Sequence, residues 1–488
     1  MAIETTVQTF QNLIDGEWVE AASKATFESI NPANVSDIVG RFPASEEADV
    51  VKAIEAAQRA FQTWRDTAPS KRAEILYKAA DLLEAGLESY AMELTREEGK
   101  TLASSRMEIK RSAQTLRYYA FEGLNISGET LPSDDPTISI STKKEPLGVV
   151  TVITPWNFPI SIPARKIAPA LAAGNTVVFK PASDTPLIAL RLVQALHEAG
   201  LPAGVINFVT GSASRTGNAL VTHPSVKAVT FTGSTRAGET IQRSVRLSTR
   251  VQLELGGKNP LLVMEDADVE QAAELAIKGG FELTGQACTG TSRVIVMDGL
   301  HDRFVRALVE KTGKLTIGNG CRQGVDIGPL ANASQLKNVL EYMEIGKAEG
   351  AELVYGGEHL TEGEYADGYF VRPAVFTNVT PSMRIAQEEI FGPVIAVIRV
   401  SSFEEAMRVA NDVEYGLSAA ICTQDPVRIH HFVNQIQAGV VKVNRPTTGN
   451  APQVPFGGVK MSSTATYRES GRGALEFYTQ IKSVYHGV

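Results

Sequence analysis

Residues 176–209 read TVVFKPASDTPLIALRLVQALHEAGLPAGVINFV, and this stretch decides the fold. Two short β-rich runs, Thr176–Phe179 and Val205–Val209, flank a helical segment around residues 187–199. Strands that alternate with helices at this spacing are typical of a parallel sheet with helices packed on it. The stretch therefore predicts an α/β unit.

The same alternation extends on both sides of this stretch. Further β-rich runs lie at Val149–Ile153, Ala228–Phe231 and Val251–Leu255, and residues 236–246 are helical in pattern. A second α/β stretch runs from about residue 258 to residue 445. We therefore predict a doubly wound parallel sheet followed by a second α/β unit.

Two segments with alternating polar and apolar residues fit neither unit. Thr137–Lys143 and the terminal Phe477–Val484 both have the pattern of exposed strands. An exposed strand edge needs a partner, which is either another subunit or the chain's own sheet, and the pattern leaves both open. Further upstream, Ser45 is a candidate N-cap for a helix whose first turn is acidic.

Length, charge and cysteine content bound the function. The chain has 488 residues, which suggests two to four domains, and a net charge of −8, which argues against binding to nucleic acids or to a membrane surface. No apolar run approaches 18 residues, and the first residues have no secretory signal pattern. Three cysteines and no clustered metal-ligand motif indicate a cytoplasmic protein without a bound metal.

Three residues are candidates for chemistry. Cys288 stands between small residues before a predicted strand, where a thiol can be reached by substrate. Glu254 ends an apolar strand, the position where ligands bind in open α/β sheets, and its carboxylate can act as a general base. Asn157 follows a strand in a turn between two prolines, where its amide can donate to an oxyanion. Taken singly, each has an ordinary structural explanation.

The signals for a nucleotide are similarly weak when taken singly. No GxGxxG motif follows the first strand of the sheet. Instead, Gly233 and Ser234 lie at a strand-to-helix turn that can hold a pyrophosphate at the helix N-terminus. Lys180 ends another predicted strand, from which it can reach ribose hydroxyls.

Together these stretches resemble the aldehyde dehydrogenase superfamily over nearly the whole chain. The most specific strings are PWNFP (155–159), LELGGKNP (253–260), GQACTG (285–290) and EEIFGPV (388–394), in the family's order and spacing. The resemblance implies that Cys288 attacks the aldehyde carbon, that Asn157 and the Cys288 N–H stabilise the oxyanion, and that Glu254 activates the water that hydrolyses a thioester. It assigns the cofactor to Trp156, Lys180, Ser183, Gly217, Gly233, Ser234, Glu389 and Phe391.

The resemblance also implies an arrangement of domains. Residues 1–121 and 146–254 form the NAD(P)-binding domain, and residues 255–456 form the catalytic domain. Residues 122–145 and 457–488 form a small β oligomerisation arm and the C-terminal tail, which implies a homodimer or a homotetramer.

The cofactor preference depends on Ser183. Family members that prefer NAD typically carry Glu three residues after the cofactor lysine, where it binds the ribose 2′-hydroxyl. Here that position is Ser183, and a hydroxyl can donate to a 2′-phosphate that a carboxylate would repel. We expect NADP to be accepted, with NAD still possible.

The substrate is an aldehyde whose identity rests on two features. Arg165 corresponds to an arginine that binds the far carboxylate in succinate-semialdehyde dehydrogenases, although those enzymes also tend to carry Arg where this chain has Glu282. VNRPTTG (443–449) and VPFGGVKMSS (454–463) resemble the 2-oxoglutarate semialdehyde (2,5-dioxopentanoate) dehydrogenases. We therefore expect 2-oxoglutarate semialdehyde first, succinate semialdehyde second and an aromatic aldehyde third. A structural ion pair is the alternative for Arg165.

Two functions of other kinds stay open. A crystallin-like or scaffold protein without turnover usually lacks the Cys or the Glu, and this chain keeps both. An acylating enzyme that passes the thioester to coenzyme A commonly lacks the base that Glu254 supplies.

Overall fold

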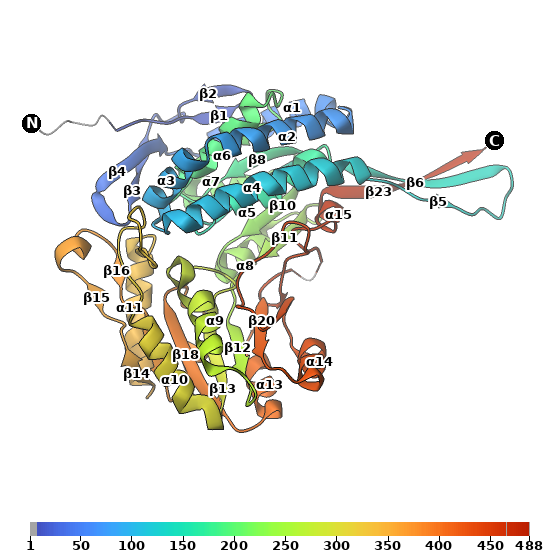
Figure 1. The fold of residues 1–488 in the computed structure, drawn as a ribbon. Helices are drawn as coiled ribbons and strands as arrows, with labels where there is room; N and C mark the ends of the chain where they lie inside the picture. The colour runs from blue at the N-terminus through green and yellow to red at the C-terminus, as the bar shows by residue number, and fades with distance from the viewer. Residues whose placement is uncertain (1–6, 465, 488) are drawn as a thin grey trace, which may run out of the picture.

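The structure, a computed structural model, describes residues 7–464 and 466–487. Figure 1 shows two bodies, each built from a sheet and helices, and a thin arm that projects from the side of the upper body. Each body contains one sheet of seven strands, and a sheet of three strands forms the arm. The predicted α/β class with a small β arm is confirmed.

The first sheet has the order β11-β10-β7-β8-β9-β1-β2. The strands from β7 to β11 are parallel, and a hairpin of β1 and β2 adds an antiparallel edge. The chain winds outward from β7 to β9 and then returns to the other side of β7 with β10. The carboxyl ends of β7 and β10 therefore border a topological switch point, where ligands bind in such sheets. The bounds are β1 Asn12–Ile14, β2 Glu17–Val19, β7 Val149–Ile153, β8 Thr176–Lys180, β9 Ile206–Phe208, β10 Val226–Thr232 and β11 Arg250–Glu254.

Helices cover both faces of this sheet because its central strands are apolar throughout. Every residue of β8 is buried, and only a sheet packed on both faces buries both sides of a strand. A hairpin of β3 (Thr26–Asn31) and β4 (Asn34–Pro43) lies beside them. The helices are α1 Glu47–Trp64, α2 Pro69–Ala85, α3 Leu87–Glu98, α4 Leu102–Glu122, α5 Ser161–Ala172, α6 Pro186–Glu198, α7 Ala213–Thr222 and α8 Thr235–Ser244.

The second sheet has the order β14-β17-β18-β13-β12-β20-β21, and all its strands except β14 run parallel. The bounds are β12 Asn259–Val263, β13 Thr291–Met297, β14 Glu352–Tyr355, β17 Ala374–Thr377, β18 Val394–Val400, β20 Ser418–Cys422 and β21 Val440–Val443. Its helices are α9 Val269–Phe281, α10 Asp298–Thr312, α11 Ala333–Ala348, α12 Arg384–Gln387, α13 Phe403–Asn411 and α14 Pro426–Gln435. Short pairs join β15 (His359–Leu360) to β16 (Phe370–Val371) and β19 (Tyr415–Gly416) to β22 (Val459–Lys460).

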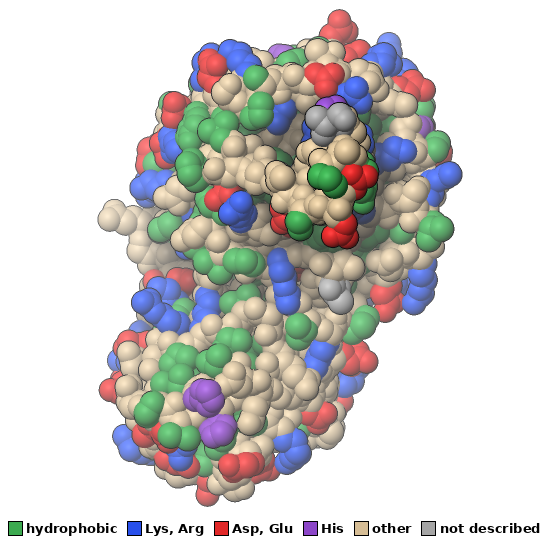
Figure 2. Space-filling model, turned by 90° about the vertical axis from the view of Figure 1, so that its right-hand side faces the viewer, with side chains coloured by type: hydrophobic (Ala, Val, Ile, Leu, Met, Phe, Trp, Pro, Cys, Tyr) green, Lys and Arg blue, Asp and Glu red, His purple; other side chains and the backbone are tan. Residues whose placement is uncertain are grey.

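The two alternating segments pair with each other in the arm. The strand β23 (Thr479–Gly487) runs antiparallel to β6 (Ile138–Pro146), whose other side pairs with β5 (Thr130–Leu131). The strand predicted at Phe477 begins two residues later, because Phe477 lies in the helix α15 (Ala474–Tyr478). Within the described residues β23 is an edge strand, and Ile481 and Tyr485 on it are 65% and 69% exposed. Figure 2 views the molecule from the arm's side and shows hydrophobic side chains among charged ones there.

Three further observations concern expectations from the sequence. The cap of α1 is Glu46 rather than Ser45, because the Ser45 hydroxyl is buried and accepts a hydrogen bond from Asn12. No helix in the described part of the chain is long and apolar enough to cross a membrane. Nor do residues 7–464 and 466–487 contain a cluster of His, Cys, Asp or Glu able to hold a metal ion. Residues 1–6 of the first predicted range, and 465 and 488 of the last, lie outside the described residues.

Candidate active site

The predicted site residues follow the carboxyl ends of neighbouring strands. Asn157 comes after β7, Lys180 ends β8, Ser234 follows β10 and Glu254 ends β11. Because these four strands are parallel neighbours in one sheet, the four residues lie along the same edge. The topology therefore brings together residues that are far apart in the chain.

The loop that carries Cys288 has an unusual backbone. It follows a short 3₁₀ segment, η2 (Glu282–Gly285), in which Leu283 and Thr284 both have φ of 56°. Left-handed conformations are uncommon for residues other than glycine and cluster at functional sites. Gly285 has φ of 69°, and a Cβ there would lie 2.1 Å from the backbone oxygen of Gly392. The cysteine loop is thus packed directly against the EEIFGPV segment.

The Cys288 side chain faces a pocket of about 80 Å³. The thiol is half-buried, and burial raises its pKa to about 12, with Arg165 opposing the shift and nearby carboxylates adding to it. A thiol in this state needs a base to take its proton. The pocket is lined by Arg111, Thr115, Phe158, Ser161, Arg165, Cys288, Thr289, Gly449, Asn450, Ala451, Pro452 and Phe456.

Asn157 is held next to the cysteine loop. Its side chain is buried, and Nδ2 donates a 2.9 Å hydrogen bond to the backbone oxygen of Gln286. That bond uses one of the two amide protons and leaves the other free to donate. Among the described residues, the backbone N–H of Cys288 donates to no acceptor. Two hydrogen-bond donors are therefore available at the cysteine loop.

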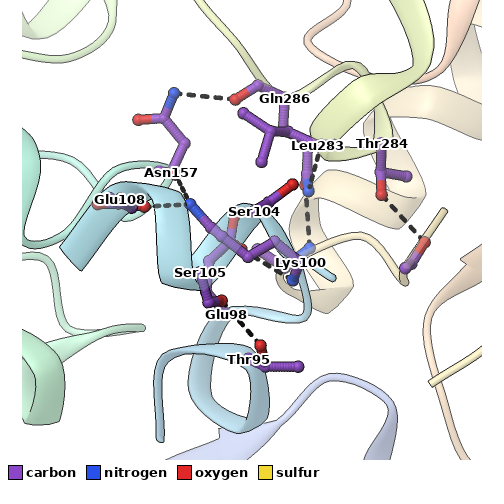
Figure 3. A network of polar contacts seen from close by, with 12 residues as sticks. Thr95, Glu98, Lys100, Ser104, Ser105, Glu108, Asn157, Leu283, Thr284 and Gln286 are labelled. Carbon is purple, nitrogen blue, oxygen red and sulfur yellow. Dashed lines mark hydrogen bonds and ion pairs between the residues drawn. The ribbon is translucent and has the colours of Figure 1, made fainter. Parts of the chain in front are cut away.

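A buried ion pair between Lys100 and Glu108 supports the turn that carries Asn157 (Figure 3). Lys100 Nζ donates 2.6 Å hydrogen bonds to the backbone oxygen of Asn157 and to a carboxylate oxygen of Glu108. The other Glu108 oxygen accepts from the backbone N–H groups of Ile160 and Ser161, at the start of α5. Lys100 and Glu108 thus hold both ends of the turn that presents Asn157. The sequence analysis missed both residues, because no local pattern links them to the turn.

A second buried network surrounds Glu254. Its Oε1 accepts a 3.2 Å hydrogen bond from Ser463, and its Oε2 has no partner among the described residues. Burial raises the pKa of Glu254 well above the usual range, and the charge of Glu469 adds to this effect. Glu469 itself has a lowered pKa because of Lys166, which donates to it at 2.6 Å, and Arg165. Glu469 therefore carries the negative charge, and Glu254 is the member of the pair that takes up a proton.

Lys180 is buried with few partners of its own. Burial lowers its pKa to about 8, and its ammonium donates to the backbone oxygen of Pro181, the one acceptor it has among the described residues. The Ser183 hydroxyl is half-buried and donates to the backbone oxygen of Gly211 at 3.2 Å. The adjacent Asp184 accepts from Asn332 at 3.0 Å. The carboxylate of Asp184 therefore lies one residue after Ser183.

The switch point between β7 and β10 carries hydroxyl groups without partners. Thr154, Thr232 and Thr235 each have a buried hydroxyl that bonds to no described residue. Ser234 caps α8, with its side chain accepting from Ala237, and the N–H of Gly233 donates to the backbone oxygen of Glu254. Gly217 lies apart from them in α7, with open space beside its Cα.

The remaining predicted cofactor residues connect the two bodies. The rings of Trp156 and Phe391 meet edge to face, with centroids 5.4 Å apart. Glu389 accepts a 2.9 Å hydrogen bond from the N–H of Gly257, and burial raises its pKa to about 7. Trp156 belongs to the turn of Asn157, so its contact with Phe391 joins that turn to the EEIFGPV segment that leads into β18.

Arg165 both lines the pocket and forms an ion pair. Its Nε lies 3.4 Å from a carboxylate oxygen of Glu469, and its guanidinium lies 5.3 Å from the centre of the Phe456 ring. Its side chain remains 16% exposed. The structural ion pair is therefore present, and Arg165 also lines the Cys288 pocket, where the substrate-binding hypothesis requires it to be.

Comparisons with known proteins agree with this geometry. The chain is 49% identical over 486 residues to the alpha-ketoglutaric semialdehyde dehydrogenase of Bacillus subtilis, covering 99% of each chain. It is similar to the structure of betaine aldehyde dehydrogenase from Staphylococcus aureus in complex with NAD+ (36% identity, 98% of this chain and 94% of that chain, TM-score 0.95). An NADP dependent enzyme of E. coli is similar at 37% identity, with 99% and 98% covered and a TM-score of 0.95. The model of the aldehyde dehydrogenase family matches residues 18–484, and this chain belongs to that family.

Proposed function

We propose that the chain oxidises 2-oxoglutarate semialdehyde to 2-oxoglutarate with NAD(P), through a thioester on Cys288. The observation that carries the proposal is the pocket in which the Cys288 thiol and the Arg165 guanidinium lie together. A nucleophile and a planar cation in one pocket suit a substrate with an aldehyde at one end and a carboxylate at the other. The full-length relative from Bacillus subtilis bears the name of that activity.

In the first half of the reaction, Cys288 adds to the aldehyde carbon. Glu254 in its ionised form takes the thiol proton, since a raised pKa makes its carboxylate a stronger base. Asn157 Nδ2 and the Cys288 N–H donate to the oxygen that becomes negative. A bound nicotinamide cofactor would supply the hydride acceptor for the substrate carbon, and the Cys288 sulfur would then hold an acyl group.

In the second half, Glu254 takes a proton from a water molecule that attacks the thioester carbonyl. The same two N–H donors stabilise the oxyanion, and the thiolate leaves as the carboxylic acid product forms. Glu254 must release the proton taken from Cys288 before this step, so that its carboxylate is ionised again; Lys166 and Glu469 form a buried charged pair next to it. Splitting one difficult step into two easier ones is the advantage of covalent catalysis.

The residues present fit a dinucleotide. The unpartnered hydroxyls of Thr154, Thr232 and Thr235 and the start of α8 suit a pyrophosphate. Lys180 has ammonium protons left for ribose hydroxyls. In this proposal Ser234, Gly233 and Gly217 border the adenosine and pyrophosphate, whereas Trp156, Glu389 and Phe391 border the nicotinamide ribose.

Both NAD and NADP are proposed cofactors, with NADP accepted because of Ser183. A hydroxyl at this position can donate to a 2′-phosphate, and no carboxylate at residue 183 repels it. Asp184 is the next residue in the chain, but one of its carboxylate oxygens accepts a hydrogen bond from Asn332. Similar proteins of known structure include one in complex with NAD+ and one described as NADP dependent.

The domains and assembly follow the sheets. We propose that residues 1–121 with 146–254 bind the cofactor and that residues 255–456 carry the nucleophile. The arm, residues 122–145 and 457–488, would pair two subunits through the open edge of β23, in a homodimer or a homotetramer. The range 457–488 has a second role, because Ser463 and Glu469 belong to the Glu254 network.

A panel of aldehydes assayed with both cofactors tests the proposal. The panel contains 2-oxoglutarate semialdehyde, succinate semialdehyde and benzaldehyde, with coenzyme A present or absent. The highest kcat/KM on the first aldehyde, with free acid as product, supports the proposal. A higher kcat/KM on another aldehyde would identify that aldehyde as the substrate instead. Acyl-coenzyme A as product would identify an acylating enzyme. No turnover with any aldehyde would indicate a scaffold protein.

A further inference from the structure

Arg111 lines the same pocket as Cys288, although no sequence motif singled it out. It lies on α4, and Thr115 one turn later on that helix also lines the pocket. Ser161 and Arg165 are the corresponding pair on α5, and the two helices pack side by side (Figure 1). Residues four apart share a helix face, so each helix presents one arginine and one hydroxyl to the pocket.

Arg165 and Arg111 differ in whether a carboxylate of the protein already neutralises their charge. Arg165 is paired with Glu469 and packs on Phe456. On α4, Arg106 and Arg117 are paired with Glu88 and Glu84. In contrast, no carboxylate of residues 7–464 or 466–487 forms an ion pair with Arg111. The Arg111 guanidinium therefore keeps its donors for a ligand.

The surroundings of Arg111 are positive overall. The pKa of Lys442 falls to about 8, chiefly through burial and then through the positive charges of Arg111 and Arg445. Lys442 donates to the backbone oxygens of Thr448 and Gly449, in the loop that closes one side of the pocket. Glu282 faces Arg111 from the cysteine loop, but without an ion pair. An anion that enters here gains favourable electrostatic energy.

We propose that Arg111 binds the carboxylate of the substrate and so sets the preference for short oxo-acid aldehydes over uncharged ones. The inference rests on the proposed function and adds a residue to it. In 2-oxoglutarate semialdehyde, four carbon–carbon bonds of about 1.5 Å place the carboxylate about 5 Å from the aldehyde carbon. Arg165 and Arg111 then bind one carboxylate from two helices, with Arg165 partly neutralised by Glu469.

The test compares Arg111→Met with Lys110→Met. Lys110 is the neighbouring exposed cation on α4, but it does not line the pocket, so its loss matches the change in net charge alone. The substrates are 2-oxoglutarate semialdehyde and pentanal, which has the same chain length and no carboxylate. We expect Arg111→Met to lower kcat/KM for the semialdehyde about 10- to 100-fold, as for a lost charge-assisted bond, and to leave pentanal within about twofold. Lys110→Met should change neither by more than about twofold.

The outcomes separate the two proposals. If the wild type prefers the semialdehyde and Arg111→Met abolishes that preference, both stand. If the wild type prefers it and Arg111→Met behaves as Lys110→Met does, the Arg111 proposal is wrong and the proposed function stands. If the wild type does not distinguish semialdehyde from pentanal, the proposed substrate is wrong and the role of Arg111 with it. Raising the ionic strength should also raise KM for the semialdehyde more in the wild type than in Arg111→Met.

Discussion

Lys100 Nζ donates a 2.6 Å hydrogen bond to the backbone oxygen of Asn157, in a site where the lysine side chain is 1% exposed. The same ammonium pairs with Glu108, which holds the start of α5. The proposed oxyanion donor is thus fixed through its backbone by a buried charge. A catalytic group whose position is set in this way loses activity when the support is removed, even though the support never touches substrate.

Lys100→Met is expected to lower both stability and kcat. The change leaves Glu108 buried without its cation, which costs about 3–5 kcal/mol of unfolding free energy, read from the urea midpoint. The double variant Lys100→Met with Glu108→Gln should recover much of that stability, because residue 108 then carries no unpaired charge. It should not recover kcat, because the Asn157 oxygen still lacks its donor. Recovery of both would show that Lys100 supports the fold alone.

Cys288→Ala is expected to abolish dehydrogenase turnover while cofactor binding, followed by fluorescence, is unchanged. Because burial raises the pKa of this thiol to about 12, the thiolate fraction in the cofactor-free wild type rises with pH across the neutral range. Alkylation by iodoacetamide should therefore accelerate steadily between pH 7 and pH 9, by about tenfold per pH unit. Turnover in Cys288→Ala would exclude the covalent route. Cys422, which is buried, is the control and should remain unmodified.

Glu254→Gln is expected to slow hydrolysis of the thioester more than formation of NAD(P)H. Gln keeps the size of the side chain and the contact with Ser463, but it cannot take a proton from water. Rapid mixing should show a burst of NAD(P)H close to one per active site, followed by a slow steady state. A full steady-state rate in this variant would assign the base to another residue. Glu254→Asp keeps the carboxylate but shortens the side chain. Its steady-state rate should lie between those of Glu254→Gln and the wild type.

Ser183→Glu is expected to shift the cofactor preference toward NAD. The added carboxylate repels a 2′-phosphate and can accept from a 2′-hydroxyl. The ratio of kcat/KM for NADP to that for NAD should fall, whereas Ser183→Gln, of similar size and uncharged, should change it less. An unchanged ratio in Ser183→Glu would mean that the 2′ position is recognised elsewhere, with Asp184 the nearest carboxylate to examine.

Arg165→Leu is expected to reduce activity selectively on aldehydes that carry a carboxylate. A lost charge-assisted bond in a partly buried site costs about 1.5–3 kcal/mol, which is about 10- to 150-fold in kcat/KM. Benzaldehyde should lose little, and it serves as the control for the broken pair with Glu469. Equal losses on both kinds of aldehyde would make Arg165 a structural residue.

Much of the fold could be read from the chain because it depends on local pattern. The runs at Val149–Ile153 and Val251–Leu255 are apolar enough for strands buried on both faces, and they occur as strands with matching bounds to within a residue. Ser45 shows the limit of the same reasoning. Serine is a favoured N-cap residue, but the Ser45 hydroxyl accepts a hydrogen bond from Asn12 on β1. Glu46 is the N-cap of α1 instead.

The sequence by itself determined the class of fold, the family and the residues of the motifs, because strand and helix periodicities and short strings such as GQACTG are local properties. Only the tertiary structure decided which side chains support them. Lys100 meets Asn157, Glu469 meets Lys166, and Arg111 reaches the pocket of Cys288 through contacts between elements distant in the chain. Burial then changes the chemistry of such groups, since removing a charge from water raises or lowers its pKa according to the neighbours that folding supplies.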